Sequence, residues 1–587
     1  MSKITLTING QTVEVDEGVT ILEAAQQMGV HIPSLCYHPD LKPEGVCRVC
    51  VVEVQGQRTL CPACAFPAAD GMTVLTHSPK VRAARKMIVE LLLANHPQDC
   101  LTCSKNQKCE LQKLAQDMGV QDIAFKGERF TSDVDDSSLS IVRNAEKCIS
   151  CRRCVRVCQD IQSVGALSAN RRGWNTQIGP AFDSPMSEVV CVYCGQCINR
   201  CPTGALKAKD PSAEVWAAIS DPTKHVVVQT APAVRAAIGE EFGMPAGSRV
   251  TGKMVSALRM LGFDKIFDTD FTADLTIMEE GSELIKRVKE GGVLPQLTSC
   301  SPGWIKFIEH FYPELLPHVS SCKSPQQMFG ALAKTYYAEK AGIDPKDIVV
   351  VSIMPCAAKK FECERPEMQD SGFQDVDYVL TTREAAGMMR EAGIDLSTLP
   401  DGEFDLPLGM STGAAVIFGN TGGVMEAAVR TAYAILSGKE LDNVNIEAVR
   451  GMEGVREAEV PIEGVVTLKA AVAHGLANAR EILEGIKSGR FADYHFIEIM
   501  CCPGGCIGGG GQPYPTSQEI RKKRTEAIYD EDSAMKIRKS HENPAVVALY
   551  KEFLGEPLSH KSHELLHTDY TARGTRTEGE PVKIEVK

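Results

Sequence analysis

Residues 191–202 read CVYCGQCINRCP, and residues 148–159, CISCRRCVRVCQ, carry the same cysteine pattern. In both stretches, two, two and three residues separate successive cysteines. Thiolates at this spacing can close around one compact metal cluster, and a 4Fe–4S cluster takes four of them. The repeated pattern therefore predicts a small module that carries two such clusters.

The run that ends in Cys201-Pro202 has the spacing of bacterial ferredoxins, in which the fourth cysteine of a run binds the other cluster. Zinc also takes four thiolates, but zinc sites rarely repeat an eight-cysteine pattern. We therefore expect a ferredoxin-like domain with crossed ligand sets. These are Cys148, Cys151, Cys154 and Cys201 for one cluster, and Cys158, Cys191, Cys194 and Cys197 for the other.

The N-terminal segment has the pattern of a small twisted sheet. Residues 3–15 alternate apolar and polar side chains around Asn9-Gly10, which is a strong hairpin signal. A helical pattern from Thr20 to Met28 follows, with Thr20 as its expected N-cap, and Val51–Val54 is a strand candidate. A helix packed across such a sheet, with a cysteine loop at one edge, predicts a β-grasp domain.

Four cysteines of this segment, Cys36, Cys47, Cys50 and Cys64, form a fair 2Fe–2S pattern. The first interval is longer than in plant-type ferredoxins, and Cys61 is an alternative to Cys64 as the fourth ligand.

A second cysteine group follows a helical segment over residues 81–93. His96, Cys100, Cys103 and Cys109 offer one imidazole and three thiolates, a set that also suits zinc. His96 could instead be a histidine that the dipole at a helix C-terminus stabilises. Because the group lies between two other iron–sulfur modules, a 4Fe–4S cluster with one histidine ligand is the favoured interpretation.

The composition agrees with a reduced, metal-rich protein. The chain has 587 residues, 23 cysteines and a formal charge of −13. That charge argues against nucleic acid as a partner. The start lacks the apolar segment of a signal peptide, and no apolar run is long enough for a membrane span, so we expect a cytoplasmic protein. Its cysteines are then thiolate ligands rather than disulfides.

Residues 120–145 are polar and acidic and read as a linker. From about residue 215, strand and helix patterns alternate. Three buried-strand candidates, Val226–Thr230, Ile348–Ile353 and Phe496–Met500, each end in an unusual motif, as expected where strand ends deliver residues to a site.

Three motifs of this region closely resemble the signatures of the FeFe-hydrogenases. They are LTSCSPGW (297–304), IMPCAAKKFE (353–362) and IMCCPGGCIGGGGQP (499–513). The glycines of the third motif allow close approach of backbone to a bulky group. The resemblance covers nearly the whole chain and implies a multidomain α/β and α+β protein. The expected parts are residues 1–78 for the 2Fe–2S domain, 79–120 for the histidine–cysteine module, 138–210 for the two-cluster domain, 215–520 for the catalytic domain and 521–587 for a small-subunit-like segment.

The resemblance also implies an H-cluster, a 4Fe–4S cubane joined to a diiron unit with CO, cyanide and azadithiolate ligands. Cys356, Cys502 and Cys506 would hold the cubane, and Lys359 would donate to a cyanide. Further residues that match pocket positions are Met354, Pro232 and Gln326.

A proton route is implied in the same way. Cys300 would exchange protons with the bridge amine, and an outward relay would follow through Glu280, Ser320, Glu283 and Arg287. Judged by sequence alone, residues 278–283, MEEGSE, also read as a solvated acidic turn.

One position departs from the family pattern. The family usually has a second cysteine after Cys300, as the fourth cubane ligand, and this chain has Ser301. An alkoxide is a harder and more basic ligand than a thiolate. Three outcomes are open: Ser301 binds iron through oxygen, Cys300 replaces it, or the cubane is incomplete. Cys501, which adjoins Cys502, is a further substitute ligand.

The function that the resemblance implies is interconversion of H2 with protons and electrons. The relay would comprise one 2Fe–2S and three accessory 4Fe–4S clusters, with electrons passing to a ferredoxin or to a flavin-containing, NAD(P)-linked subunit. The second arrangement would make the chain part of a hetero-oligomer, for example an electron-bifurcating complex. The alternative is a catalytically impaired variant, a hydrogen sensor or a scaffold of the same fold.

Overall fold

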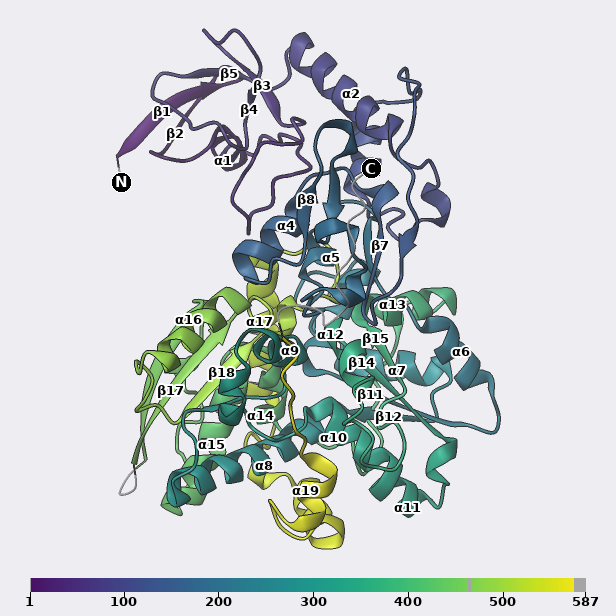
Figure 1. The fold of residues 1–587 in the computed structure, drawn as a ribbon, viewed down its shortest axis with the longest axis vertical. Helices are drawn as coiled ribbons and strands as arrows, with labels where there is room; N and C mark the ends of the chain where they lie inside the picture. Colours follow the sequence, from purple (N-terminus) through teal and green to yellow (C-terminus); the bar gives the residue numbers. More distant parts are fainter. Residues whose placement is uncertain (1, 463–465, 575–587) are drawn as a thin grey trace.

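The computed structural model describes residues 2–462 and 466–574 (Figure 1). At the N-terminus, a five-stranded sheet has the order β2-β1-β5-β3-β4. The predicted hairpin and helix are confirmed: Asn9 and Gly10 both have positive φ, as a type I′ turn requires, and Thr20 caps α1 in a capping box with Glu23. The elements are β1 (Lys3–Ile8), β2 (Gln11–Asp16), α1 (Ile21–Gln27), β3 (Val51–Val54), β4 (Cys61–Pro62) and β5 (Thr73–Leu75).

The middle of the chain holds α2 (Pro79–Ala94), α3 (Glu110–Asp117) and a small sheet of order β10-β7-β6. The expected linker over residues 120–145 is wrong at its C-terminal end, because β6 and β7 belong to this sheet and Ser138 and Ser140 are buried. The Ser138 hydroxyl accepts hydrogen bonds from the backbone N–H groups of Ser140 and Ile141, where the chain turns into β7. The elements are β6 (Val134–Asp135), β7 (Ile141–Asn144), α4 (Arg153–Arg156), β8 (Ser168–Asn170), β9 (Gln177–Gly179), α5 (Gln196–Arg200) and β10 (Leu206–Ala208).

Two four-stranded sheets, β12-β11-β14-β15 and β13-β18-β17-β16, form the lower part of the molecule (Figure 1). The first is fully parallel, and β13, β18 and β17 are parallel in the second. The three predicted strands appear as β11, β14 and β18. The strands are β11 (His225–Thr230), β12 (Lys265–Asp268), β13 (Gln296–Leu297), β14 (Ile348–Met354), β15 (Tyr378–Thr381), β16 (Val455–Ile462), β17 (Val466–His474) and β18 (Phe496–Met500).

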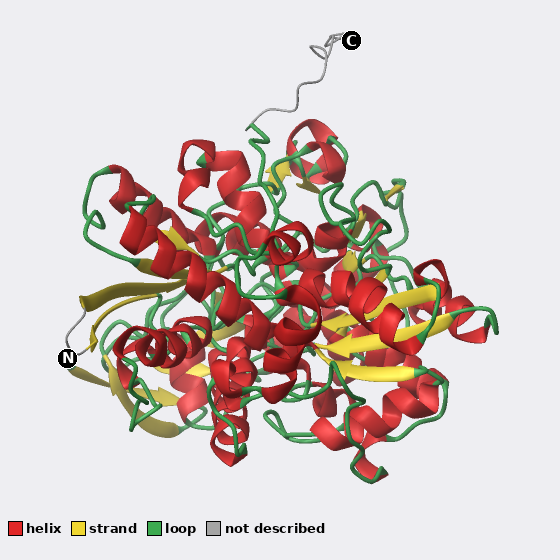
Figure 2. Cartoon of the chain, turned by 90° about the horizontal axis from the view of Figure 1, so that it is seen from below, coloured by secondary structure: helices red, strands yellow, loops and turns green. Residues whose placement is uncertain are grey.

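Helices lie over and around these sheets (Figure 2). The C-terminal part runs from α17 along the lower part of the molecule to α19 (Figure 1). Within the described ranges, no helix is long and apolar enough to cross a bilayer. The helices are α6 (Ser212–Ser220), α7 (Thr251–Leu261), α8 (Thr269–Glu290), α9 (Pro302–Phe311), α10 (Pro325–Leu332), α11 (Ala338–Ala341), α12 (Ala358–Cys363), α13 (Thr382–Glu391), α14 (Gly413–Val416), α15 (Gly423–Ser437), α16 (Leu476–Lys487), α17 (Gln518–Ala534), α18 (Pro544–Leu549) and α19 (His560–Leu566).

Asp40 ties three distant parts of the chain together. Its carboxylate accepts hydrogen bonds from Arg200 at 2.8 Å and from Arg521 at 2.8 and 2.9 Å. Arg200 ends α5 and Arg521 lies in α17. Burial opposes ionisation of Asp40, but the hydrogen bonds and charges of Arg521 and Arg200 prevail and hold its pKa at about 2.

Replacement of Asp40 by asparagine is expected to lower the free energy of unfolding by about 3 kcal/mol at pH 7, because two buried guanidinium groups lose their counter-charge. A depressed carboxyl pKa contributes stability above the ordinary value of 3.8 and loses it as the pH falls toward 2, so the full effect is present at pH 7. Thermal unfolding measures the change. Asp16→Asn, which breaks an exposed pair with Lys3, is the control and should change little; equal shifts in both variants would contradict the account.

Candidate active site

The carboxyl ends of β11, β13, β14 and β18 converge on one cavity. About 740 Å³ in this cavity and its opening to solvent is free of protein atoms. The eight residues of the implied cubane and diiron pocket, with Ser301 at the fourth ligand position, line it together with Cys300, the first residue of the implied proton route, although they are spread from residue 232 to residue 506. They are Pro232, Cys300, Ser301, Gln326, Met354, Cys356, Lys359, Cys502 and Cys506.

Of the thiols in this cavity, Cys502 is buried, and Cys300, Cys356 and Cys506 are partly buried. Burial raises the pKa of Cys506 to about 12, and burial together with the charge of Cys502 raises the pKa of Cys356 still further. Uncharged thiols gathered in one place become thiolates when they bind a metal cation, and soft thiolates select iron–sulfur clusters or zinc. Together with the size of the cavity, this donor set fits a cubane held by three cysteines.

The glycine run does two separate things. Gly504 and Gly505 have φ values of +81° and +92°, which side chains rarely adopt, and Gly505 lines the cavity. A Cβ on Gly510 would lie 2.3 Å from the carbonyl oxygen of Cys194. The end of the run therefore packs against the backbone of the two-cluster module, whereas Gly505 and Gly509 line the cavity.

Ser301 occupies the position just before α9. Its hydroxyl accepts a hydrogen bond from the backbone N–H of Cys501 at 3.2 Å, and its carbonyl accepts from Trp304 and Ile305 at 3.0 Å. The Cys501 thiol accepts a contact from the Gln162 amide at 3.8 Å, on the side of the two-cluster module.

Lys359 projects from the first turn of α12 toward the cavity. Its ammonium donates to the carbonyl of Cys300 at 3.3 Å, to Ser324 at 2.7 Å and to Glu362 at 2.7 Å. Glu362 was not among the residues predicted from the sequence, although its spacing of three residues from Lys359 on a helix was a usable signal. Glu362 and Ser324 fix the direction of the ammonium group.

The acidic residues of α8 lead outward from the cavity. Glu280 is buried, which raises its pKa to about 8, and the charge of Glu283 acts in the same direction. Ser320 donates to Glu283 at 2.6 Å, and Arg287 donates to the other Glu283 oxygen at 2.7 Å. The alternative of a solvated acidic turn at residues 278–283 is wrong, because these residues lie inside α8 with Glu280 facing the interior.

The two-cluster module brings its cysteines together across the repeat. Cys148, Cys151, Cys154 and Cys201 line one cavity of about 460 Å³. Burial raises the pKa of Cys191 to about 12, with further contributions from the charges of Cys194 and Cys158. Burial and the charges of neighbouring cysteines, Cys194 first among them, raise the pKa of Cys197. The structure thus groups the cysteines as the crossed ligand sets require.

In the N-terminal domain, Cys36 contacts Cys47 and Cys64, and Cys64 contacts Cys50. The Cys61 thiol instead donates to the carbonyl of Thr59 at 3.8 Å. Farther along, burial lowers the pKa of His96 to about 4, and its Nδ1 has no hydrogen-bond partner among the described residues. A neutral, unpartnered imidazole suits metal ligation.

Cys64→Ala is expected to abolish the 2Fe–2S electron paramagnetic resonance signal and to remove about two iron atoms per chain. Cys61→Ala should keep both, because its thiol points elsewhere. Metal analysis and spectra of the dithionite-reduced proteins measure the difference. Loss of the signal in Cys61→Ala with retention in Cys64→Ala would reverse the assignment.

Comparison with known proteins matches the chain to iron-only hydrogenases and also, at 30–31% identity over 65% of this chain, to cytosolic iron–sulfur assembly proteins. The family model for the C-terminal domain of the iron-only hydrogenase large subunit matches residues 224–510, and that for the iron hydrogenase small subunit matches residues 518–573. The "NADP-reducing hydrogenase subunit HndD" of Solidesulfovibrio fructosivorans is 52% identical over 98% of this chain and 100% of its own length. The chain belongs to the iron-only (FeFe) hydrogenase family. It is therefore an oxidoreductase, and its accessory domains are iron–sulfur domains of ferredoxin-like type.

The accessory parts of this hydrogenase match family models too. A 2Fe–2S iron–sulfur cluster binding domain covers residues 1–79, an iron–sulfur binding region of NADH-ubiquinone oxidoreductase covers 85–124, and a ferredoxin-like domain of NADH-quinone oxidoreductase covers 139–207. "Iron hydrogenase 1" of Clostridium pasteurianum is 41% identical over 96% of this chain and 99% of its own. A solved variant of the FeFe-hydrogenase HydA1 from Chlamydomonas reinhardtii aligns with a TM-score of 0.56 and 46% identity, over 62% of this chain and 100% of its own.

Proposed function

We propose that this hydrogenase interconverts H2 with two protons and two electrons at an H-cluster held in the cavity between the two sheets. Cys356, Cys502 and Cys506 would bind the cubane, with the hydroxyl of Ser301 in the fourth ligand position. The observation that carries the proposal is the convergence of the thiols of Cys356, Cys502 and Cys506 with Lys359 on one cavity. The buried Glu280 lies in α8, which also contributes to the lining of the cavity.

When bound, the cofactor supplies the making and breaking of the H–H bond. The protein supplies the surroundings. Pro232 and Met354 line the cavity with apolar atoms, which exclude water and strengthen electrostatic interactions. The ammonium of Lys359, aimed by Glu362 and Ser324, would donate a charge-assisted hydrogen bond to an anionic ligand such as cyanide. Gln326 completes this wall.

Proton movement falls to the residues of α8 and their neighbours. Cys300 would pass a proton between the cavity and Glu280, whose raised pKa lets the carboxyl both hold and release a proton near neutral pH. Ser320 and Glu283 would continue the route, and Arg287 fixes the Glu283 carboxylate near the surface.

Electrons would travel through four accessory clusters. The proposed ligands are Cys36, Cys47, Cys50 and Cys64 for the 2Fe–2S cluster; His96, Cys100, Cys103 and Cys109 for the first 4Fe–4S cluster; and the two crossed sets of the ferredoxin-like domain. The proposed domains keep the boundaries expected from the sequence.

The partner that we favour is a flavin-containing, NAD(P)-linked subunit in a hetero-oligomer. The name of the relative HndD, which describes an NADP-reducing hydrogenase subunit, supports this choice. Direct docking of a ferredoxin is the alternative, and an electron-bifurcating complex would use both. H2-dependent reduction of NADP only when the flavoprotein subunit is added would support the first scheme, whereas direct reduction of ferredoxin by the chain alone would support the second.

The experiment that tests the activity itself is H2 uptake with a viologen dye, after anaerobic loading with the diiron cofactor. Turnover supports the proposal. Because Ser301 stands where the family usually has a cysteine ligand, a second candidate function is an impaired enzyme, a hydrogen sensor or a scaffold of the same fold. Absence of turnover in this chain with turnover restored in Ser301→Cys would identify an impaired enzyme, whereas absence of turnover in both would favour a sensor or scaffold.

A further inference from the structure

The small-subunit-like segment forms a two-residue bridge with the chain next to the proposed proton relay. Lys323 donates its N–H to the carbonyl of Leu566 at 2.8 Å, and Thr568 donates to that of Ser321 at 2.8 Å. These bonds pair Cys322 with His567. Because Ser320 is a relay residue, the bridge places a histidine of the C-terminal segment beside the relay.

One edge of the His567 ring is fixed by a buried carboxylate. Glu279, the neighbour of Glu280 in α8, receives hydrogen bonds from Tyr550 at 2.5 Å, from the N–H of Leu558 at 2.9 Å and from Ser562. His567 Nε2 lies 3.1 Å from the same carboxylate. Burial opposes ionisation of Glu279, yet these hydrogen bonds keep its pKa below the ordinary value. The Nε2 atom therefore carries a proton, and Nδ1 is left as an acceptor.

The other edge of the ring faces the relay. His567 Nδ1 lies 2.8 Å from the hydroxyl of Ser321 and 4.0 Å from the thiol of Cys322. That thiol lies 3.9 Å from a carboxylate oxygen of Glu283. Burial raises the pKa of Cys322, so the group is a thiol with a proton to pass on. A continuous series of contacts thus joins Glu283 to His567 and Glu279.

We propose that His567 is a proton-holding residue at the outer end of the relay, reached from Glu283 through the Cys322 thiol. The thiol gives its proton to Nδ1 and takes the proton of the Glu283 carboxyl, so no charge is left on sulfur. The imidazolium is stabilised by Glu279 and discharges through Cys322, or through the half-buried Ser321 to water. The inference rests on the relay of the proposed function, and it gives the small-subunit-like segment a part in proton transfer.

The charged and titratable groups around the ring are consistent with this role. The carboxylates of Glu279 and Glu283 belong to α8, and the thiol of Cys322 lies in the segment before α10. Tyr550 donates a hydrogen bond to the Glu279 carboxylate. The exposed ring of His563 stacks on His567 with centroids 4.2 Å apart. A positive charge on the His563 ring would repel a protonated His567 and so favour transfer of the His567 proton to solvent.

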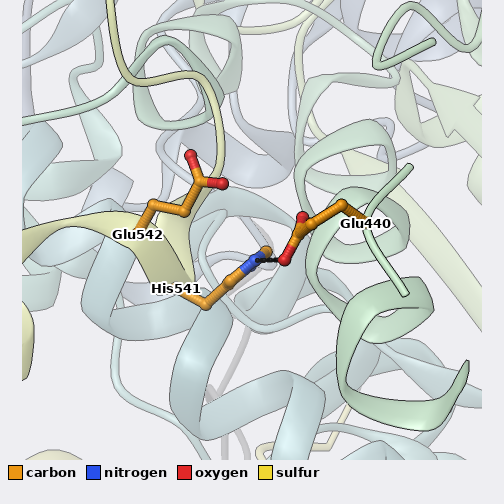
Figure 3. A group of neighbouring side chains, drawn as sticks. All are labelled: Glu440, His541 and Glu542. Atoms are coloured by element: carbon orange, nitrogen blue, oxygen red, sulfur yellow. Dashed lines mark ion pairs between the residues drawn. The ribbon is translucent and has the colours of Figure 1, made fainter. Parts of the chain in front are cut away.

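A surface group of Glu440, His541 and Glu542 has the donor atoms of a metal site (Figure 3). The ammonium of Lys539 already pairs with Glu440 and lies 3.6 Å from Glu542, and His541 lies 3.5 Å from Glu440. A cation therefore already occupies the position that a metal would take, and this group carries no proposal.

The test measures exchange of H2 with D2O, which depends on proton transfer but needs no electron acceptor. His567→Gln keeps two hydrogen-bonding groups but cannot hold the proton, and we expect exchange to slow by about tenfold. Cys322→Ala should slow it similarly, Cys322→Ser should restore most of the rate, and the Cys322→Ala/His567→Gln double variant should be no slower than either single variant. Unchanged rates, or losses that multiply in the double variant, would overturn the inference.

Tyr550→Phe is the matched control, because it removes one hydrogen bond to Glu279 and leaves Nδ1 untouched. A loss in Tyr550→Phe as large as in His567→Gln would show a structural role and would overturn the inference. Glu280→Gln separates the proposed relay from its extension to His567. Fast exchange in Glu280→Gln would refute the relay itself, whereas slow exchange there with normal exchange in His567→Gln would refute only the extension. If the chain exchanges no H2, the series is run in the Ser301→Cys background, and silence there refutes the proposed function and the extension together.

Discussion

Replacement of Ser301 by cysteine is expected to raise H2 uptake by about tenfold or more after identical loading with the diiron cofactor. The three thiols of the cavity, Cys356, Cys502 and Cys506, leave the fourth corner of the proposed cubane to a hydroxyl. A thiolate is a softer and far less basic ligand than an alkoxide, so the cysteine should increase cluster occupancy. Ser301 already lines the cavity, and a cysteine side chain has the same unbranched shape as serine, so the fold should be preserved.

A control variant tests whether the oxygen of Ser301 binds iron. Ser301→Ala shortens the side chain by one oxygen atom and so removes the hydroxyl and its hydrogen bond from the N–H of Cys501. If oxygen binds iron, Ser301→Ala should lose cubane iron relative to the natural chain. Equal iron content and equal turnover in all three proteins would show that position 301 is not a ligand.

Replacement of Glu280 by glutamine is expected to lower H2 turnover by roughly two to three orders of magnitude, the scale of a lost proton-transfer group. Glutamine matches the glutamate in size and can hydrogen-bond, but it cannot exchange a proton with Cys300. Turnover with viologen measures the loss. Glu290→Gln, at the exposed end of the same helix, is the control and should leave the rate unchanged.

The pH dependence gives a second measure of Glu280. Burial raises its pKa from 4.5 to about 8, so the folded protein keeps a proton that the unfolded chain loses above pH 4.5. The contribution of Glu280 to stability therefore falls as the pH rises from 4.5 to 8 and is constant above. Glu280→Gln should be more stable than the natural chain at pH 8, and the difference should shrink toward pH 5. H2 production should decline above about pH 8, where the carboxyl no longer holds its proton; no decline would contradict the assignment.

Short-range patterns predicted most of the fold elements and the groups of cysteines. Val51–Val54 and Phe496–Met500 are strands with the predicted bounds, because burial and β-branched side chains agree there. Cysteines two or three residues apart must lie close in space whatever the surrounding fold. The choice between Cys61 and Cys64 was harder, since Cys61 lies in the short strand β4 and Cys64 in the turn that follows it, and the direction of each thiol depends on the fold.

Contacts between distant segments could not be predicted from the sequence. Nothing near His567 indicates that it meets Cys322 and Glu279, because an isolated bridge between residues 245 positions apart leaves no local pattern. Residues 134–144 have a polar, acidic composition, yet they include β6 and β7, and β7 pairs with β10. Ser138 and Ser140 are buried there, and the Ser138 hydroxyl accepts a hydrogen bond from the backbone N–H of Ser140. Roles in the cavity came from resemblance to a family, and the structure adds the residues that support them, such as Glu362.

In the proposed function, the cavity between the two sheets holds a cofactor that reacts with H2. The most direct measurement is the infrared spectrum of the loaded protein in the region of iron-bound CO and cyanide, recorded under argon and then under H2. The account predicts bands in that region whose positions change under H2 and return under argon, and their loss in Cys506→Ala. Bands whose positions do not change under H2, in both the unsubstituted chain and Ser301→Cys, would contradict the proposed function.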